Sequence, residues 1–146
     1  MSPTNKHPGI IDTMKSKAVL LASLAIVLFL AACSSNAPAI NVELNNFEFG
    51  DVVNGVIATR DIQVQNDGNA PLVIDWVSAS CGCTTVTIDS NLISPGETAI
   101  VHIEFDSGAH GPELTGQLIR QVFIRSNDPV NPEMIVEFSA NILPPE

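Results

Sequence analysis

The sequence predicts an all-β domain, an antiparallel β-sandwich of about seven short strands. Three observations support this prediction. From Ile40 onward, apolar and polar residues alternate with a period of two in several segments. Clusters of glycine, proline, asparagine and aspartate separate these segments at the spacing of a sandwich. No segment after Cys33 shows the 3.6-residue period of a helix. Alternation, in place of continuous apolar runs, also argues against a parallel sheet.

The N-terminal segment precedes this domain and has the composition of an export signal. Lys15 and Lys17 come before an apolar run, residues 18–32, whose single polar member is Ser23. A transmembrane helix needs about 20 apolar residues, so this run of fifteen is short for a membrane span. Met14 is an alternative start, in which case residues 1–13 precede the true N-terminus.

The apolar run ends in Leu30-Ala31-Ala32-Cys33, which resembles the lipobox of bacterial lipoproteins. The resemblance implies that residues 1–32 are a signal peptide and that Cys33 is lipidated, giving a membrane anchor. Residues 33–39 then form the lipidated cysteine and a short polar tether, and residues 40–146 form the domain. The residue directly after Cys33 is Ser34 and not aspartate, which in lipoproteins of Gram-negative cells implies the outer membrane. We therefore expect a cell-envelope protein that faces the periplasm.

The charge of the mature chain excludes one class of partner. From Cys33 to Glu146 it has 114 residues, the size of one domain with its own core. Three arginines stand against fifteen carboxylates, a net charge of −12 with both histidines neutral. Such a surface repels phosphate backbones, so we expect a protein partner and no nucleic acid.

The predicted strands share a buried face of alternating apolar residues. We expect Trp76 and Phe138 in the core. In chain order the expected buried positions are Ile40, Val42 and Leu44; Phe47 and Phe49; Val56, Ile62 and Val64; Leu72, Ile74 and Trp76; Val86 and Ile88; Ala99, Val101, Ile103 and Phe105; and Met134, Val136, Phe138, Ala140 and Ile142. A further strand is expected over residues 117–125.

Turn signals separate these strands. Asn54-Gly55 predicts a hairpin-type turn. Asn66-Asp67-Gly68-Asn69 is the clearest turn, because these residues tolerate a left-handed backbone. Ser94-Pro95-Gly96-Glu97 has proline at the second position of a turn, and residues 106–116 read as a glycine-rich loop. Together these elements indicate an immunoglobulin-like sandwich.

Several motifs, taken in order, resemble the bacterial domain-of-unknown-function family numbered 1573. They are Phe47-x-Phe49-Gly50-x-Val52-x-x-Gly55, Val64-x-Asn66-x-Gly68-x-x-Pro71-Leu72-x-Ile74, Ser80-Cys81-Gly82-Cys83-Thr84, Pro95-Gly96, Phe105-Asp106 and Ser126-Asn127-Asp128-Pro129. That family is similar to Hydin-type and major-sperm-protein immunoglobulin-like domains. The resemblance covers about Phe47 to Ile142 and implies a seven-stranded sandwich with no established activity and no catalytic residues.

Cys81 and Cys83 are the remaining candidate for chemistry, and three interpretations stay open. In an extended strand their α-carbons would be about 6.6 Å apart, near the limit for a disulfide, and a bend at Gly82 would shorten this distance. The pair is structural, either reduced or joined as a disulfide, or it is redox-active, or it binds copper(I) through two thiolates. Zinc fits poorly, since no second cysteine or histidine pair is spaced to complete four ligands.

No other motif points to catalysis. His102 lies on the polar face of its strand and His110 in the glycine-rich loop; either histidine can approach the cysteines. No hydrolase, phosphate-binding or calcium-binding spacing is present. We therefore expect no enzyme, no cofactor and no metal. Two functions remain: a lipid-anchored, non-enzymatic structural or interaction module, or a periplasmic thiol-redox or copper(I)-handling protein using Cys81 and Cys83.

Overall fold

The structure, a computed structural model, describes residues 36–145, which form nine β-strands. Lipidation at Cys33 and the signal peptide over residues 1–32 lie outside the described residues. The strands are β1 (Ile40–Val42), β2 (Asn46–Val53), β3 (Ile57–Asn66), β4 (Leu72–Ala79), β5 (Thr84–Ile88), β6 (Leu92–Ile93), β7 (Thr98–Asp106), β8 (Gly116–Ser126) and β9 (Glu133–Leu143). The sequence predicts about seven strands. One of the additions is β6, whose two residues are too few to show an alternation.

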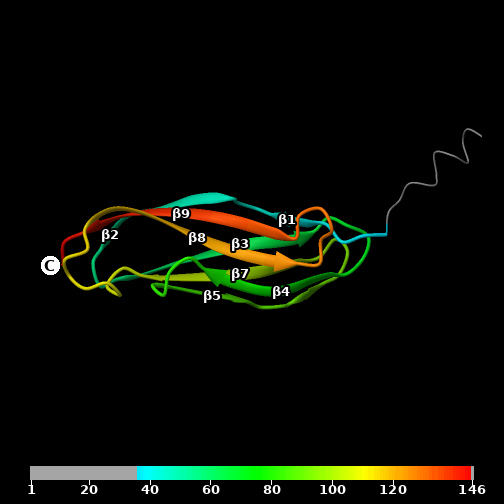
Figure 1. Ribbon diagram of the computed structural model, residues 1–146, viewed down its shortest axis with the longest axis horizontal. Helices are drawn as coiled ribbons and strands as arrows, with labels where there is room; N and C mark the ends of the chain where they lie inside the picture. The colour runs from blue at the N-terminus through cyan, green and yellow to red at the C-terminus, as the bar shows by residue number, and fades with distance from the viewer. Residues whose placement is uncertain (1–35, 146) are drawn as a thin grey trace, which may run out of the picture. The chain divides into compact units, whose positions relative to one another are not determined.

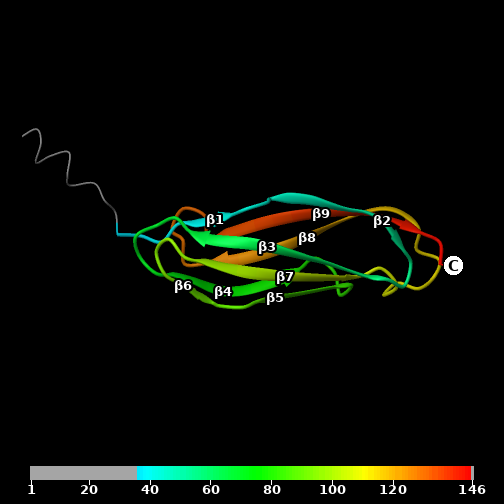
Figure 2. The ribbon, with the colours of Figure 1, turned by 180° about the vertical axis from the view of Figure 1, so that it is seen from behind.

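The strands form the two layers of a sandwich. One sheet has four strands in the order β1-β3-β7-β5, and the other has five in the order β2-β9-β8-β4-β6. In both views the strands run along the same long direction of the domain (Figures 1 and 2). The described chain enters at one end of the domain, next to β1, and its C-terminus lies at the opposite end (Figure 1). The all-β, immunoglobulin-like prediction is confirmed.

The core lies between the two sheets and is built from the alternating residues. Ala99, Val101, Ile103 and Phe105 on β7 are each at most 1% exposed, as predicted. On β9, Val136, Phe138, Ala140 and Ile142 are buried in the same way. Burying one large aliphatic side chain contributes about 1.5–3 kcal/mol, so these two strands supply much of the stabilisation.

Four phenylalanines pack at the centre of this core. The Phe138 ring stacks on Phe47, with centroids 5.6 Å apart, and meets Phe49 edge-on at 5.2 Å. Phe105, from the opposite sheet, lies 5.5 Å from Phe138. Edge-to-face and offset pairs at these distances are the favoured aromatic geometries. The cluster joins β2, β7 and β9 and links the two sheets.

Trp76 is not a core residue, and this prediction is wrong. Its side chain is 39% exposed, whereas Leu72 and Ile74 on the same strand are buried. The pairing of β4 with β8 shifts between Ile74 and Trp76, so two steps along β4 match one step along β8. This β-bulge at Asp75 reverses the alternation, and Trp76 therefore faces outward. Val77, in place of Trp76, packs against the core.

The turn at Asn54-Gly55 forms as predicted, but it does not make a hairpin. Gly55 has a φ of 93°, and the Val56 N–H donates to the Val53 carbonyl at 3.0 Å. The strands on either side, β2 and β3, belong to different sheets. The buried Ser107 hydroxyl holds this inter-sheet turn: its oxygen accepts from the Val56 N–H, and its single proton lies between the Val56 carbonyl at 2.7 Å and the Val53 carbonyl at 3.0 Å. Val56 itself is 49% exposed, contrary to the prediction that it faces the core.

One strand pair is parallel, which corrects the purely antiparallel prediction. β2 pairs with β9 in parallel, and the other pairs are antiparallel. A parallel pair needs a long crossover, and here the rest of the domain lies between the two strands in sequence. Alternation within one strand shows which face is buried but not the direction of its partner.

Residues 36–146 form a compact unit with their own core. All of the described strand pairing is internal to this unit. The domain can therefore be produced without residues 1–35. In this part of the chain there is no helix long and apolar enough to cross a membrane.

Candidate functional site

The cysteine pair lies between β4 and β5, where the chain turns from one sheet to the other. The structure joins Cys81 and Cys83 in a disulfide, with α-carbons 5.2 Å apart. That distance is shorter than an extended strand gives, because the chain turns at Gly82 and Cys83. Cys83 is 2% exposed and belongs to the core, whereas Cys81 is half-buried. Thr84 flanks the pair, its Oγ1 3.3 Å from the Cys81 sulfur.

Replacing both cysteines with serine is expected to lower the free energy of unfolding by about 1–2 kcal/mol. The reason is the short loop that the disulfide closes, which restricts the unfolded chain only slightly. Chemical denaturation of the purified domain checks this value.

Thiol titration and metal analysis of the same domain separate a structural pair from a redox or copper site. We expect no titratable thiol under native conditions and no bound metal. Stoichiometric copper, or a disulfide that exchanges readily with glutathione, would contradict a purely structural role. Within residues 36–145 no three His, Cys, Asp or Glu side chains are grouped for a metal ion.

His102 pairs with an aspartate and not with the cysteines. Its Nδ1 lies 2.7 Å from Asp61 Oδ1, on the outer face of the four-stranded sheet. Thr84, which directly follows the cysteine pair, pairs with Phe105 on β7. Phe105 lies three residues beyond His102 on that strand. At about 3.3 Å per residue this separates His102 from the pair by about 10 Å along the strand. Cys83 is also buried on the other side of the sheet.

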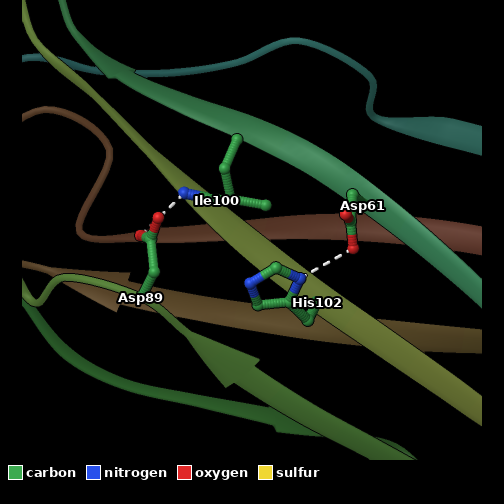
Figure 3. A network of polar contacts seen from close by, with 4 residues as sticks. All are labelled: Asp61, Asp89, Ile100 and His102. Atoms are coloured by element: carbon green, nitrogen blue, oxygen red, sulfur yellow. Dashed lines mark hydrogen bonds and ion pairs between the residues drawn. The ribbon is translucent and has the colours of Figure 1, made fainter.

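Figure 3 shows how these polar side chains lie on the sheet surface. Asp61 and His102 point toward each other from β3 and β7, and Asp89 accepts a hydrogen bond from the Ile100 N–H at 2.9 Å. Both members of the His102–Asp61 pair are well exposed. His110, the other histidine, is exposed in the loop over residues 106–116. An exposed pair on a flat sheet face does not enclose a substrate, and we assign it no catalytic role.

Asp128 is a buried carboxylate with a structural role. It is 2% exposed and accepts hydrogen bonds from the N–H groups of Ile40 (2.8 Å), Val130 (2.7 Å) and Asn131 (3.1 Å). Burial raises the pKa of Asp128, but these backbone hydrogen bonds outweigh it and hold the pKa below its ordinary value. The carboxylate thereby fastens the start of β1 to the loop between β8 and β9.

The last residues of the predicted tether lie against the domain. Ala37 exchanges hydrogen bonds with Asn69, and the Ala39 carbonyl accepts from the Asp67 N–H at 2.8 Å. A Cβ added to Gly68 would lie 2.5 Å from the Ala39 nitrogen. Gly68 therefore permits a close approach of two chain segments. It is not among the described glycines with a positive φ, so the left-handed backbone predicted for this turn does not occur at Gly68.

The outer face of the five-stranded sheet carries an apolar patch, formed by Trp76, Phe123 and Ile135. They lie on β4, β8 and β9, which are neighbours in the sheet. Ile119 is exposed on the same face, four residues before Phe123 on β8, with the Gln121–Glu137 pair between them. Phe123 pairs directly with Ile135, and Trp76 pairs with Arg125, two residues from Phe123. Trp76, Ile119 and Ile135 are 39%, 58% and 45% exposed, and Phe123 is half-buried.

The outer face of the four-stranded sheet is largely polar by contrast. Of the seven large apolar side chains exposed in residues 36–145, four lie on the five-stranded sheet, namely Trp76, Ile119 and Ile135 together with Leu92 on β6. Ile57 is the first residue of β3 in the four-stranded sheet, and Val56 and Val130 lie outside the strands. Apart from Ile57 and the half-buried Ile100, the four-stranded sheet presents Thr59, Asp61, Gln63, Gln65, Thr85, Thr87, His102 and Glu104.

An open hollow of about 260 Å³ lies on the same face at Ile119, on the other side of the Gln121–Glu137 pair from the patch. Glu48 and Glu137 line it from β2 and β9, and Ser139 on β9 pairs with Glu48 on one side and with Ile119 on the other. Gln121 donates a long hydrogen bond to Glu137, at 3.4 Å. The hollow thus combines an apolar wall with two exposed carboxylates.

Sequence reasoning missed this face because it placed Trp76 in the core. A signal was present in β8 and β9. Val122-Phe123-Ile124 and Met134-Ile135-Val136 are runs of three apolar residues, and such a run puts an apolar side chain on both faces of a strand. Since Phe123 pairs with Ile135, the outward members of the two runs are neighbours.

Solved structures with this fold come from proteins of different kinds. A protein of unknown function from Porphyromonas gingivalis W83 superposes with a TM-score of 0.63 at 20% identity, over 77% of this chain. This chain spans about half of that protein's length, 50%. The ASH/PapD-like domain 7 of human CEP192 superposes with a TM-score of 0.59 at 11% identity, over 80% of this chain and 93% of that domain. The YadV chaperone gives 0.53 at 11% identity, over 70% of this chain and 51% of that one.

These identities are low, so the likenesses establish a PapD-like, immunoglobulin-like fold and nothing about activity. No curated protein matches the sequence. The family model described as "Protein of unknown function (DUF1573)" matches residues 40–142, which is almost the whole described domain. The chain therefore belongs to the DUF1573 family, as its sequence motifs predict.

Proposed function

We propose that this protein is a lipid-anchored, extracytoplasmic interaction module with a non-enzymatic role. The observation that carries the proposal is the apolar patch, which leaves Trp76 and Ile135 exposed on the same sheet face as Ile119. Exposed apolar side chains that gather on one face mark protein-interaction sites, whereas isolated ones are common. The anchor rests on the lipobox-like motif at Cys33 and places the protein in the cell envelope, at the periplasmic face of the outer membrane.

The chemistry-bearing side chains of the domain support a binding role. Cys81 and Cys83 are joined to each other, and His102 is paired with Asp61 at the surface. The Asp128 carboxylate is engaged by backbone donors. Each of these groups already has a partner within the domain.

The ordered end of the tether determines how the anchored domain would stand. If Cys33 carries the lipid, only residues 34–36 separate it from Ala37, which is hydrogen-bonded to Asn69. Each residue spans at most about 3.6 Å, so the turn over residues 66–69 would remain within about 15 Å of the lipid attachment. β4 begins next to this turn and runs for eight residues, so its far end at Ala79 lies about 25 Å from the turn. The apolar patch would then lie along the side of the domain, accessible to a neighbouring protein.

Lipidation is tested by labelling cells with a clickable fatty acid. The wild-type protein is expected to take up the label, and the Cys33→Ala variant is expected to lose it and leave the membrane fraction. The three acyl chains usual in lipoproteins anchor stably, since each buried methylene contributes about 0.8 kcal/mol. Persistent label in Cys33→Ala would contradict the assignment.

The interaction role is tested by crosslinking in intact cells. The chain from Cys33 onward contains no lysine, so amine-reactive reagents would miss it, and a photo-crosslinking amino acid is needed. Placed at Ile135, in the patch, it is expected to give one discrete adduct that mass spectrometry identifies. Placed at Thr87, on the polar face, it serves as the matched control. Equal background capture at both positions, with no discrete adduct, would contradict an interaction role.

A further inference from the structure

The charges around the apolar patch select the chemistry of its partner. The outer face of the five-stranded sheet carries five exposed carboxylates and one arginine, Arg125. The carboxylates are Glu48, Asp51, Asp75, Glu133 and Glu137. They lie on β2, β4 and β9, so they flank the patch on both sides. Glu133 and Glu137 are each two residues from Ile135, and Asp75 adjoins Trp76, so a partner that covers the patch must approach these three carboxylates.

This distribution argues against two occupants. A second copy of the chain, placed face to face, would bring five carboxylates against five more, which is repulsive at close range. A bilayer with anionic headgroups would be repelled in the same way. A polypeptide that carries lysine or arginine beside apolar side chains meets neither obstacle.

The hollow at Ile119 has the chemistry to accept one such side chain. The aliphatic stem of a lysine or arginine can lie on Ile119 while its charged end reaches Glu48 and Glu137. Charge-assisted hydrogen bonds to carboxylates are stronger than neutral ones, and guanidinium groups can make two at once. Phe123 lies four residues further along β8, about 13 Å from Ile119, so the patch of Trp76, Phe123 and Ile135 can cover apolar residues further along the same segment.

We propose that the outer face of the five-stranded sheet binds a basic, partly apolar polypeptide segment, with its cationic side chain in the hollow between Glu48 and Glu137. The proposal rests on the interaction role proposed above and specifies its surface and partner. Trp76 is the chain's single tryptophan and lies in the patch, so its fluorescence reports binding directly.

The test titrates the lipid-free domain, residues 36–146, with a short synthetic peptide that alternates lysine and valine. Saturable binding is expected, with a blue shift of the Trp76 emission and an affinity that falls with added salt. The double variant Glu48→Gln, Glu137→Gln is expected to bind about tenfold more weakly. The matched control Asp61→Asn, Glu104→Gln removes two charges from the other sheet and is expected to change affinity less than about twofold.

Five results would overturn the proposal. Equal binding of a glutamate–valine peptide would exclude charge selection, and equal binding of a lysine–glycine peptide would exclude the apolar patch. An equal loss in the control variant would show non-specific attraction by net charge. An emission shift with protein concentration alone would indicate a second copy, and a shift with anionic vesicles a lipid surface. If one of these results is obtained and photo-crosslinking in cells still gives a discrete adduct at another face, the interaction role stands. Only the assignment of this surface and of a basic partner is then overturned.

Discussion

Replacing Phe138 with alanine is expected to lower the free energy of unfolding by about 3–5 kcal/mol. Phe138 is fully buried and its ring contacts Phe47, Phe49 and Phe105. The substitution removes the transfer free energy of the ring and leaves a cavity where both sheets meet. Urea denaturation of the domain, followed by circular dichroism, measures the change.

Trp76→Ala is the matched aromatic truncation on the outer face. Since Trp76 is 39% exposed, its loss is expected to cost about 1 kcal/mol or less. A loss for Trp76→Ala equal to that of Phe138→Ala would show that the indole packs in the core and that the bulge at Asp75 is misplaced.

Replacing Asp128 with alanine is expected to lower the free energy of unfolding by about 3 kcal/mol at neutral pH. The variant leaves the N–H groups of Ile40, Val130 and Asn131 without their carboxylate acceptor. An unsatisfied buried donor costs about 1–3 kcal/mol, and loop donors that reach water cost less. Asp67→Ala is the control, since its single side-chain hydrogen bond, to Asn41, is exposed.

The contribution of Asp128 is also expected to depend on pH. The folded-state pKa is held below the ordinary value of about 3.9, so the folded state binds the proton less readily than the unfolded state. The stabilisation is therefore complete above about pH 4 and is lost as the pH falls through the folded pKa. The stability difference between wild type and Asp128→Ala should narrow below about pH 4. A constant difference down to pH 2 would contradict this role.

Those parts of the fold that depend on local alternation can be predicted from the sequence. β7 and β9 each have one buried and one exposed face, so Phe105 and Phe138 identify the core side of their strands correctly. The features that depend on the partner strand cannot be predicted in this way. A one-residue bulge at Asp75 moves Trp76 to the surface, and the parallel direction of β2 relative to β9 leaves no local sequence signal.

The candidate site was only partly foreseeable for the same reason. The motif around Cys81 and Cys83 indicates that a bend at Gly82 would bring the sulfurs together, but it does not decide between a disulfide, a redox-active pair and a copper(I) site, and the structure joins the two cysteines. The apolar patch becomes visible only when the register places Phe123 beside Ile135. The apolar triplets in β8 and β9 are the one sequence feature that points to it.

Acrylamide quenching of Trp76 fluorescence in the purified domain tests whether an apolar patch containing Trp76 lies on the surface, open to a partner. Because the chain has a single tryptophan, the signal comes from this residue alone. Because Trp76 is 39% exposed, we expect emission to the red of a buried indole and acrylamide quenching at a substantial fraction of that in the urea-unfolded chain. A blue-shifted emission that acrylamide barely quenches would place Trp76 in the core and contradict an exposed patch.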